Sequence, residues 1–421
     1  MPRIIKNTLL NYLSNSFEKE TIIKPERIFN LNQKPIKSGF IVYLCEREIR
    51  VKDNFALQFA LQKSKELNLA LKIIHPKTKY EYEPKQNYID NQITQTKKQF
   101  QKIGLDFEII QKTPQEILKN LEIAMLILDF NPILKRKYPD DINCKIYEID
   151  GHNIVPARFV SDKQEYSASG LRRKIYFNIY EFLNEFENFK NQKTEGDYVL
   201  EDFIENKLQY YSNFKNDPSK NITSGLSKYL NLGFISSQRA AIEVIKSNVS
   251  DENKESFLEE LIIRKELADN FCLYAKSFKN LSCAPNWAKK SLKDHRIDIR
   301  PYIYSSFEME NYKTHDKLWN SAQKQLVKEG TIQGYLRMYW AKKILEWTIS
   351  PNEAIKIAIY LNDKYAYDSP SSNGYTGILW ACAGLHDRAF RSFPIFGKVR
   401  KMTFKSIKRK YDIEKYIRKY F

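Results

Sequence analysis

Over residues 38–150 the chain alternates short apolar runs with longer amphipathic segments, and this alternation limits the fold more than any other feature. The short runs are rich in β-branched residues, as buried strands are, whereas the segments between them repeat apolar residues every three or four positions, as helices do. Such an alternation predicts a parallel sheet covered by helices. The expected strands are 39–45, 70–75, 107–110, 124–128 and 145–149, and the expected helices are 53–68, 87–103 and 114–121.

No glycine-rich phosphate-binding motif follows any of these predicted strands. Neither G-x-G-x-x-G nor the Walker pattern occurs after them, although the common dinucleotide and nucleotide sites depend on such glycines. The sheet could hold a nucleotide-like ligand, but a standard dinucleotide site is disfavoured.

The pattern changes along the rest of the chain. It weakens into polar and aromatic stretches between about residues 155 and 205, as in an interdomain connector, and becomes mostly helical beyond 206. We therefore predict a Rossmann-like α/β domain followed by an all-helical C-terminal domain. The expected parts are an N-terminal extension (1–36), the α/β domain (37–165), a linker (166–205) and the helical domain (206–421).

The net charge of +18 points to a polyanionic partner. Lys and Arg side chains bind phosphates and release counterions, so a basic surplus of this size favours nucleic acid. The many Lys, Asn and Ile residues also fit an AT-rich genome, and charge alone leaves both explanations open. The last 24 residues (398–421) favour nucleic acid, because they hold ten Lys/Arg against two Asp/Glu, with aromatic residues between them.

Composition also bears on the compartment. The five cysteines lie far apart, are odd in number and form no C-x-x-C pair, so we expect neither a disulfide framework nor a zinc site. A reducing cytoplasmic setting, or a nuclear one in a eukaryote, is the default. No apolar run approaches the roughly 20 residues that span a bilayer. The first residues lack the long apolar region and the cleavage site of a signal peptide.

The tryptophans form the most informative pattern of the helical region. Trp340 and Trp347 are seven residues apart in a predicted helix, so they lie on nearly the same face, roughly 10 Å apart along its axis. Arg337 lies one turn before Trp340, and Trp319 on the preceding helix can pack alongside. Large aromatic residues at this spacing are common in ordinary cores. Because indole is also readily oxidised, a row of indoles can carry electrons, and both interpretations stay open.

Metal and hydrolytic chemistry have little support. The five histidines are scattered, without metal-site spacing, and no G-x-S-x-G nucleophile motif is present, so we expect no metal. Residues 222–240 place Ser, Thr and Gly before a helix. Backbone and hydroxyl donors at such a turn can hold a phosphate, although these residues are also ordinary helix caps.

Several long, ordered segments of the helical region and of the predicted α/β domain match one known family. They are 51–57, 150–177, 225–240, 259–272, 315–348, 359–365, 373–375, 384–390 and 394–402. With these segments the chain resembles the class II cyclobutane pyrimidine dimer photolyases, within the photolyase/cryptochrome superfamily. The resemblance runs from about residue 37 to 415 and leaves the first 36 residues unassigned.

The resemblance implies the photolyase fold with FAD bound in the helical domain, which accounts for a flavoprotein without Rossmann glycines. It implies that the turn 223–227 holds the FAD diphosphate, that Arg337 and Asp368 form an ion pair beside the flavin, and that Asn362 lies near flavin N5. The implied FAD-binding residues are Tyr211, Thr223, Ser224, Gly225, Leu226, Ser227, Arg337, Asn362 and Asp368.

The resemblance also implies light-driven repair of cyclobutane pyrimidine dimers in double-stranded DNA, by electron transfer from excited reduced FAD to a flipped-out lesion. Electrons would reach the flavin through Trp340, Trp319 and Trp347, in that order from the flavin outward. With Glu260 and Asn362, these tryptophans are the implied catalytic residues. The implied lesion and DNA contacts are Lys215, Asn216, Glu260, Arg264, Met338, Trp380 and Arg400.

The chain departs from the family's pattern at several positions. Lys215 stands where Arg is common, Phe390 where Trp is usual, and Arg264 where some members have a second lesion-stacking Trp. Lesion affinity is therefore the property most open to change. The alternative function is a cryptochrome-like FAD photoreceptor without repair activity. The protein is expected to be a monomer, and its antenna chromophore is expected to be of the deazaflavin type or absent.

Overall fold

The computed structural model describes residues 8–13, 17, 19–20, 22–134, 142–186, 189 and 192–421. Their contacts divide the chain into two compact units, and each is described by itself. Unit 1 comprises Met1–Asp162, Leu171–Asn206 and Ser224–Glu266, and unit 2 comprises Lys163–Gly170, Lys207–Thr223 and Leu267–Phe421. The predicted domain bounds remain a prediction, because compact units need not coincide with domains.

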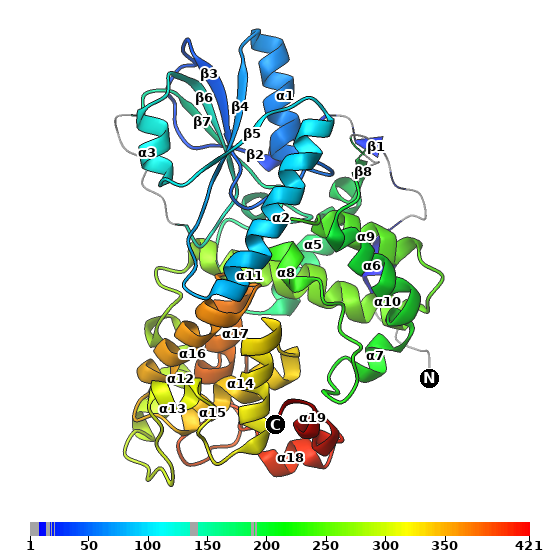
Figure 1. Cartoon of the computed structure of the whole chain (residues 1–421). Helices are drawn as coiled ribbons and strands as arrows, with labels where there is room; N and C mark the ends of the chain where they lie inside the picture. Colours follow the sequence, from blue (N-terminus) through cyan, green and yellow to red (C-terminus); the bar gives the residue numbers. More distant parts are fainter. Residues whose placement is uncertain are drawn as a thin grey trace. The chain divides into compact units, whose positions relative to one another are not determined.

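Unit 1 contains a six-stranded sheet in the order β2-β7-β6-β3-β4-β5 (Figure 1). Strands β3 to β7 run parallel, and β2 pairs antiparallel with β7 at one edge. All the predicted strands are confirmed, whereas the antiparallel edge strand was not predicted. The strands are β2 (Ile28–Asn30), β3 (Phe40–Leu44), β4 (Leu71–Pro76), β5 (Phe107–Ile110), β6 (Ile123–Asp129) and β7 (Lys145–Ile149).

The central strands of this sheet are buried, as their continuous apolar runs predict. Val42, Leu44, Leu126 and Ile146 belong to one buried cluster, the pattern expected where helices cover a parallel sheet. The three predicted helices are confirmed as α1 (Phe55–Leu67), α2 (Glu83–Lys102) and α3 (Pro114–Lys119). Helix α1 begins where the Asn54 side chain accepts a hydrogen bond from the Leu57 N–H group, a common N-terminal cap.

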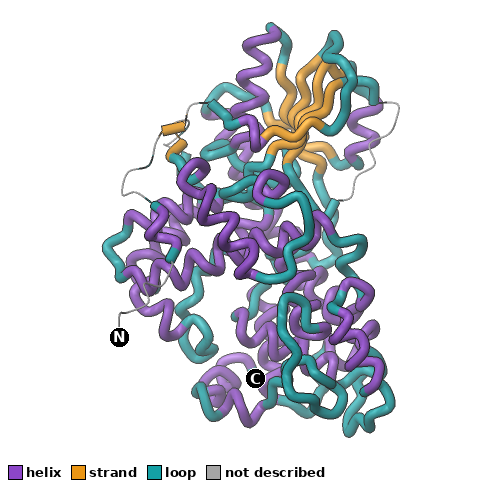
Figure 2. The backbone as a smooth tube through the Cα atoms, turned by 180° about the vertical axis from the view of Figure 1, so that it is seen from behind, coloured by secondary structure: helices purple, strands orange, loops and turns teal. Residues whose placement is uncertain are grey.

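The remaining regular structure is almost entirely helical (Figure 2). Residues 166–205, expected as a linker, contain two helices, α5 and α6. Up to residue 264 the elements are α4 (Ala157–Val160), α5 (Ala168–Phe182), α6 (Glu195–Asn206), α7 (Tyr211–Phe214), α8 (Ser227–Asn231), α9 (Ser237–Lys246), α10 (Asp251–Leu258), a π-helical turn (Glu259–Arg264) and the parallel strand pair β1 (Lys19–Glu20) and β8 (Glu185–Phe186).

The helices after the π-helical turn confirm the predicted all-helical region. They are α11 (Lys265–Tyr274), α12 (Asn286–Asp294), α13 (Ser306–Glu310), α14 (Lys317–Glu329), α15 (Gly334–Glu346), α16 (Pro351–Tyr365), α17 (Ser372–Ala383), α18 (Phe404–Lys408) and α19 (Ile413–Tyr420). Within unit 2, α15 packs against α14, α16 and α17. Among the described helices, none is both long enough and apolar enough to cross a bilayer.

Arg27, just before β2, joins several parts of unit 1. Its side chain is only 1% exposed, and its guanidinium carbon lies 4.0 Å from the centre of the Phe55 ring and 5.4 Å from that of Phe182. The guanidinium donates hydrogen bonds of 2.8 to 3.3 Å to the carbonyl oxygens of Asp150, Asn153, Ile154 and Phe182 and to the Gln238 side chain. Part of the predicted N-terminal extension is therefore built into the core of this unit.

Replacing Arg27 by leucine is expected to destabilise the protein by about 3–5 kcal/mol, because four carbonyl oxygens and an amide would lose a buried charged donor. Urea unfolding followed by circular dichroism measures the loss. Arg158→Leu is the matched control, since the Arg158 side chain is 30% exposed in its ion pair with Glu148 and should cost about 1 kcal/mol or less. Equal losses in the two variants would contradict the role given to Arg27.

Candidate active site

Three buried tryptophans of unit 2 form a continuous row. The rings of Trp319 and Trp340 are parallel to within 1°, with their centres 6.3 Å apart. The ring of Trp347 meets that of Trp319 at 71° and 5.6 Å, and all three side chains are at most 2% exposed. The sequence predicted that Trp319 packs beside the other two. In the structure Trp319, on α14, contacts both of the others. Trp340 lies on α15, and Trp347 directly follows the end of that helix.

Hydrogen bonds fix the two parallel indoles. The Trp319 indole N–H donates to the backbone oxygen of Trp340 at 3.0 Å, and the Trp340 indole N–H donates to Gln323 Oε1 at 2.8 Å. Asp316 caps α14 by accepting a hydrogen bond from the Trp319 backbone N–H at 2.9 Å, and it also accepts one from the Tyr339 hydroxyl. The ring planes are thus held by bonds at their edges as well as by packing.

The aromatic row continues from Trp347 to the surface of unit 2. Tyr304 and His315 contact the Trp347 ring at 5.4 and 5.3 Å between ring centres, and His315 stacks on Tyr302, which is 49% exposed. The Tyr304 hydroxyl lies 2.7 Å from His315 Nδ1. Burial lowers the pKa of His315. Sequence reasoning treated His315 only as one of five scattered histidines and missed its contact with Trp347, which depends on the fold of the 302–315 segment.

A second group of side chains in unit 2 surrounds the start of α17. Arg337 and Asp368 form the expected ion pair, with Arg337 Nη1 3.2 Å from Asp368 Oδ2. Asn362 is 2% exposed, and a Cβ atom on Gly374 would lie 2.9 Å from its Nδ2 atom. A side chain at position 374 would therefore displace the Asn362 amide, which glycine leaves in place. The Ser369 hydroxyl donates to the Asn362 backbone oxygen at 2.8 Å, which ties the loop that carries Asp368 to α16.

Some buried polar atoms of unit 2 have no hydrogen-bond partner among the described residues. They are Ser372 Oγ and Thr376 Oγ1, one turn apart on α17, and Gln323 Nε2. Each of these three residues is at most 6% exposed. Buried polar groups are usually hydrogen-bonded, and those left without a partner protein atom commonly meet a ligand or an ordered water. Sequence reasoning missed all three, because Ser, Thr and Gln within a helical pattern carry no such signal.

The residues expected at a lesion and along DNA divide between the two units. In unit 2, Trp380 and Met338 are half-buried, whereas Asn216 and Arg400 are exposed. The Lys215 Nζ atom lies 5.5 Å from the ring centre of Tyr211. The end of α17, which carries Trp380, is held by Lys342: its Nζ donates to the Ala381 oxygen at 2.9 Å. Burial lowers the pKa of Lys342 to about 8.

In unit 1, Glu260 and Arg264 lie in the π-helical turn. Glu260 is exposed, and the Arg264 Nε–H donates to the Glu259 carboxylate at 3.1 Å. A π-helical turn inside an α-helix changes which way the following side chains point, and such turns are frequent at functional sites. The sequence contains no pattern that predicts this turn.

The turn expected to hold a diphosphate, residues 223–227, is divided between the two compact units. Thr223 ends a segment of unit 2, and Ser224–Ser227 begins a segment of unit 1. Gly225 has a φ of +71°, a conformation that favours glycine, and the Leu226 N–H donates to Ser224 Oγ at 3.3 Å. The helix that follows, α8, has five residues, so any anion held here would depend on the amides of the turn rather than on a long helix.

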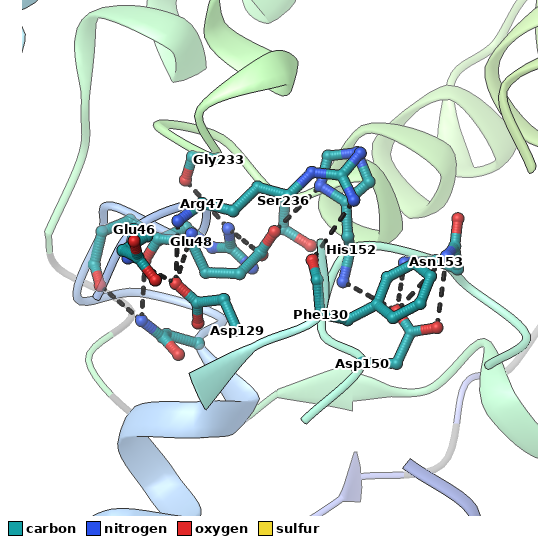
Figure 3. A network of polar contacts seen from close by, with 12 residues as sticks. Glu46, Arg47, Glu48, Asp129, Phe130, Asp150, His152, Asn153, Gly233 and Ser236 are labelled. Carbon is teal, nitrogen blue, oxygen red and sulfur yellow. Dashed lines mark hydrogen bonds and ion pairs between the residues drawn. The ribbon is translucent and has the colours of Figure 1, made fainter. Parts of the chain in front are cut away.

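The carboxyl edge of the sheet in unit 1 holds a buried polar network (Figure 3). The strand order reverses between β3 and β6, which is the place where open α/β sheets bind ligands. Asp129, at the end of β6, accepts hydrogen bonds there from the backbone N–H groups of Glu46, Arg47 and Glu48 at 2.8 to 3.0 Å. Burial raises the pKa of Asp129. The amides that could hold a phosphate at this edge are thus occupied by a side chain of the protein itself.

Comparison with known proteins gives close relatives. A deoxyribodipyrimidine photo-lyase from Potorous tridactylus is 34% identical over 433 residues, covering 91% of this chain and 81% of that protein. One from Oryza sativa subsp. japonica is 37% identical over 371 residues, covering 74% and 73%. No protein-family model matches the chain.

Solved structures share the fold at lower identity. A class III photolyase from Agrobacterium tumefaciens has a TM-score of 0.65 at 15% identity, covering 95% of this chain and 88% of that one. A Synechocystis cryptochrome has a TM-score of 0.67 at 14% identity, covering 92% and 89%. An archaeal photolyase from Sulfolobus tokodaii, described with two FAD molecules, has a TM-score of 0.65 at 13% identity, covering 90% of each chain. The predicted fold class is confirmed by these likenesses.

Proposed function

The chain belongs to the deoxyribodipyrimidine photo-lyase family, and we propose that it repairs cyclobutane pyrimidine dimers in double-stranded DNA, as a class II enzyme that uses light and reduced FAD. The observation that carries this proposal is the 34% identity to a named photo-lyase over 91% of the chain. The proposal includes action as a monomer in the cytoplasm or, in a eukaryote, in the nucleus.

The residues around α17 fit the flavin end of FAD. The Arg337–Asp368 pair offers a charged donor and acceptor beside one another, and the Asn362 amide can donate or accept at a flavin nitrogen. The unpartnered Ser372 and Thr376 hydroxyls supply further polar atoms that a bound molecule would satisfy. When bound and reduced, FAD would supply under light the electron that opens the cyclobutane ring.

Other residues would hold the rest of the cofactor and the lesion. Tyr211 and the 223–227 turn are the proposed contacts of the FAD sugar-phosphate portion. A dimer must leave the base stack to be reached, and the half-buried Trp380 ring offers a surface on which flipped bases would stack. Met338, also half-buried, is a further proposed contact. Glu260 is the proposed carboxyl partner of the dimer. Lys215, Asn216, Arg264 and Arg400 would contact the lesion or the DNA backbone.

The tryptophan row would carry electrons inward to reduce the flavin before repair. Its members are buried, and successive ring centres are 6.3 and 5.6 Å apart, so each transfer would be short. Trp340 would be nearest to the flavin, with Trp319 next and Trp347 outermost. This role supplements the packing that the same rings provide, because a buried row of aromatics also stabilises unit 2.

Two parts of the proposal stay open to direct observation. An antenna chromophore of the deazaflavin type, or none, belongs to the proposal, and the absorption spectrum of the purified protein decides between them.

The alternative of a cryptochrome-like photoreceptor is supported by the fold shared with the Synechocystis cryptochrome. Recovery of thymine absorbance in irradiated DNA under blue light supports repair. Bound flavin without such recovery supports the photoreceptor, and absence of flavin contradicts both.

Trp340→Phe is expected to lose most of the light-driven reduction of FAD but to repair normally once it is reduced chemically, because the row is needed only to load the flavin. Flavin absorbance during blue illumination measures the first property, and a repair assay with chemically reduced protein measures the second. Trp287→Phe is the matched control, because the Trp287 ring lies against Gly384, outside the row. Loss of repair in the chemically reduced Trp340→Phe variant would contradict the assigned role.

Thr376→Val tests whether the unpartnered hydroxyl serves the cofactor. The FAD-free variant should be as stable as the parent or more stable by about 1 kcal/mol, because a buried hydroxyl without a partner costs free energy. The increase in thermal stability that added FAD gives should be smaller than in the parent. Thr348→Val is the control: its hydroxyl donates to the Ile344 oxygen at 2.9 Å, so that variant should lose stability with or without FAD. If Thr376→Val also loses stability both with and without FAD, the Thr376 hydroxyl has a purely structural role.

Trp380→Ala is expected to weaken binding to dimer-containing DNA by about 1–3 kcal/mol, the usual worth of a base stacked on an aromatic ring, with little effect on undamaged DNA. Arg400→Ala should weaken binding to both by similar amounts, because a phosphate contact does not depend on the lesion. Fluorescence anisotropy at one fixed salt concentration measures both. An equal effect of Trp380→Ala on the two DNAs would remove Trp380 from the lesion site.

A further inference from the structure

The acceptors of the inner indole N–H groups share one property: neither is a base. The Trp340 indole donates to a side-chain amide oxygen, Gln323 Oε1, at 2.8 Å. The Trp319 indole donates to a backbone amide oxygen, that of Trp340, at 3.0 Å. The orientation of the Gln323 amide follows from chemistry, because an indole N–H can only donate and so must face the amide oxygen.

This choice of acceptor matters when an indole loses an electron. The oxidised indole is a far stronger acid than the neutral one, and a carboxylate or imidazole at hydrogen-bond distance would take its N–H proton. The deprotonated radical is a weaker oxidant, so it would accept an electron from the next indole less readily. A neutral amide oxygen cannot hold the proton, and the charge therefore stays on the ring until an electron arrives.

Gln323 is not explained by packing alone. Its side chain is 0% exposed, and its Nε2 atom has no hydrogen-bond partner among the described residues. A buried amide left in this state costs free energy that an apolar side chain of the same length would not cost. The bond that Gln323 accepts from Trp340 is the feature in the structure that offsets this cost.

The nearby charged groups are engaged elsewhere. The Asp316 carboxylate, which caps α14, accepts its bonds from the Trp319 backbone N–H and the Tyr339 hydroxyl. Lys343 donates to Glu346 and lies 5.5 Å from the centre of the Trp347 ring. His315 meets the row at Trp347, its outer end. Among these groups, none is bonded to the indole nitrogen of Trp340 or Trp319.

We propose that Gln323 is a positioning residue of light-driven FAD reduction, which keeps the indole proton on Trp340 and so lets the positive charge move outward to Trp319. The inference rests on the proposed function, because it requires a light-excited flavin as the oxidant. Trp340 gives one electron to the flavin and then regains one from Trp319, whose parallel ring is 6.3 Å away. No N–H bond breaks at either indole in these two transfers.

The test compares Gln323→Glu and Gln323→Met by flash photolysis of the flavin-loaded protein, in which protonated and neutral indole radicals have different absorption bands. In the parent, only the protonated radical should form at the inner indoles. In Gln323→Glu at raised pH, where the introduced carboxyl is ionised, the neutral radical should form at Trp340 and the yield of reduced flavin should fall several-fold. Lowering the pH should restore the yield, because a protonated carboxyl is again a neutral acceptor.

Gln323→Met keeps the side-chain length without an amide, so it should lower the yield at every pH without producing the neutral radical. Gln325→Glu is the matched control: Gln325 lies on the same helix but bonds to Glu329 and Tyr416, and its variant should behave as the parent does. Parent-like radicals and yields in both Gln323 variants would overturn the inference. Failure of the chemically reduced parent to repair dimers would instead overturn the proposed function.

Discussion

The buried guanidinium of Arg27 is the interaction on which unit 1 depends. Its hydrogen-bond acceptors come from the 150–154 loop, the end of α5 and the start of α9, and its faces meet Phe55 of α1 and Phe182 of α5. A buried charge is costly unless it is hydrogen-bonded, so these contacts favour the arrangement of the segments that supplies the acceptors. The same unit carries Ser224–Ser227 and Glu260.

The sequence predicts what local periodicity determines. The strands of the parallel sheet and the helices α1 to α3 follow from apolar runs that need no partner to be recognised. Edge strand β2, with three residues, has no such run and exists because it pairs with β7. Arg27 in isolation is an ordinary surface-type residue, and only the folded chain brings its five acceptors together. The π-helical turn at Glu260 likewise depends on packing rather than on a local pattern.

In the candidate site, too, some features could be predicted from local sequence and others depend on the fold. The seven-residue spacing predicted that Trp340 and Trp347 share a helix face, but the contact of Trp319 with both depends on how α14 packs on α15. The Arg337–Asp368 pair was expected only from family resemblance, since 31 residues separate its partners. Ser372, Thr376 and Gln323 could not be predicted, because an unsatisfied polar atom is defined by what surrounds it. A bound polar molecule that paired with these atoms would offset the cost of burying them.

The aromatic row of unit 2 shows a change in chemistry from its buried end to the surface. At Trp340 and Trp319 the N–H acceptors are amide oxygens, whereas Tyr304, beside Trp347, has its hydroxyl 2.7 Å from an imidazole nitrogen. The lowered pKa of His315 favours the neutral imidazole, which can accept a proton. The same hydroxyl accepts a bond from the His315 backbone N–H at 3.0 Å, so its own proton is free to face Nδ1. In the proposed electron transfer, the inner indoles would keep their protons, whereas the neutral imidazole at the exposed end of the row could take one up.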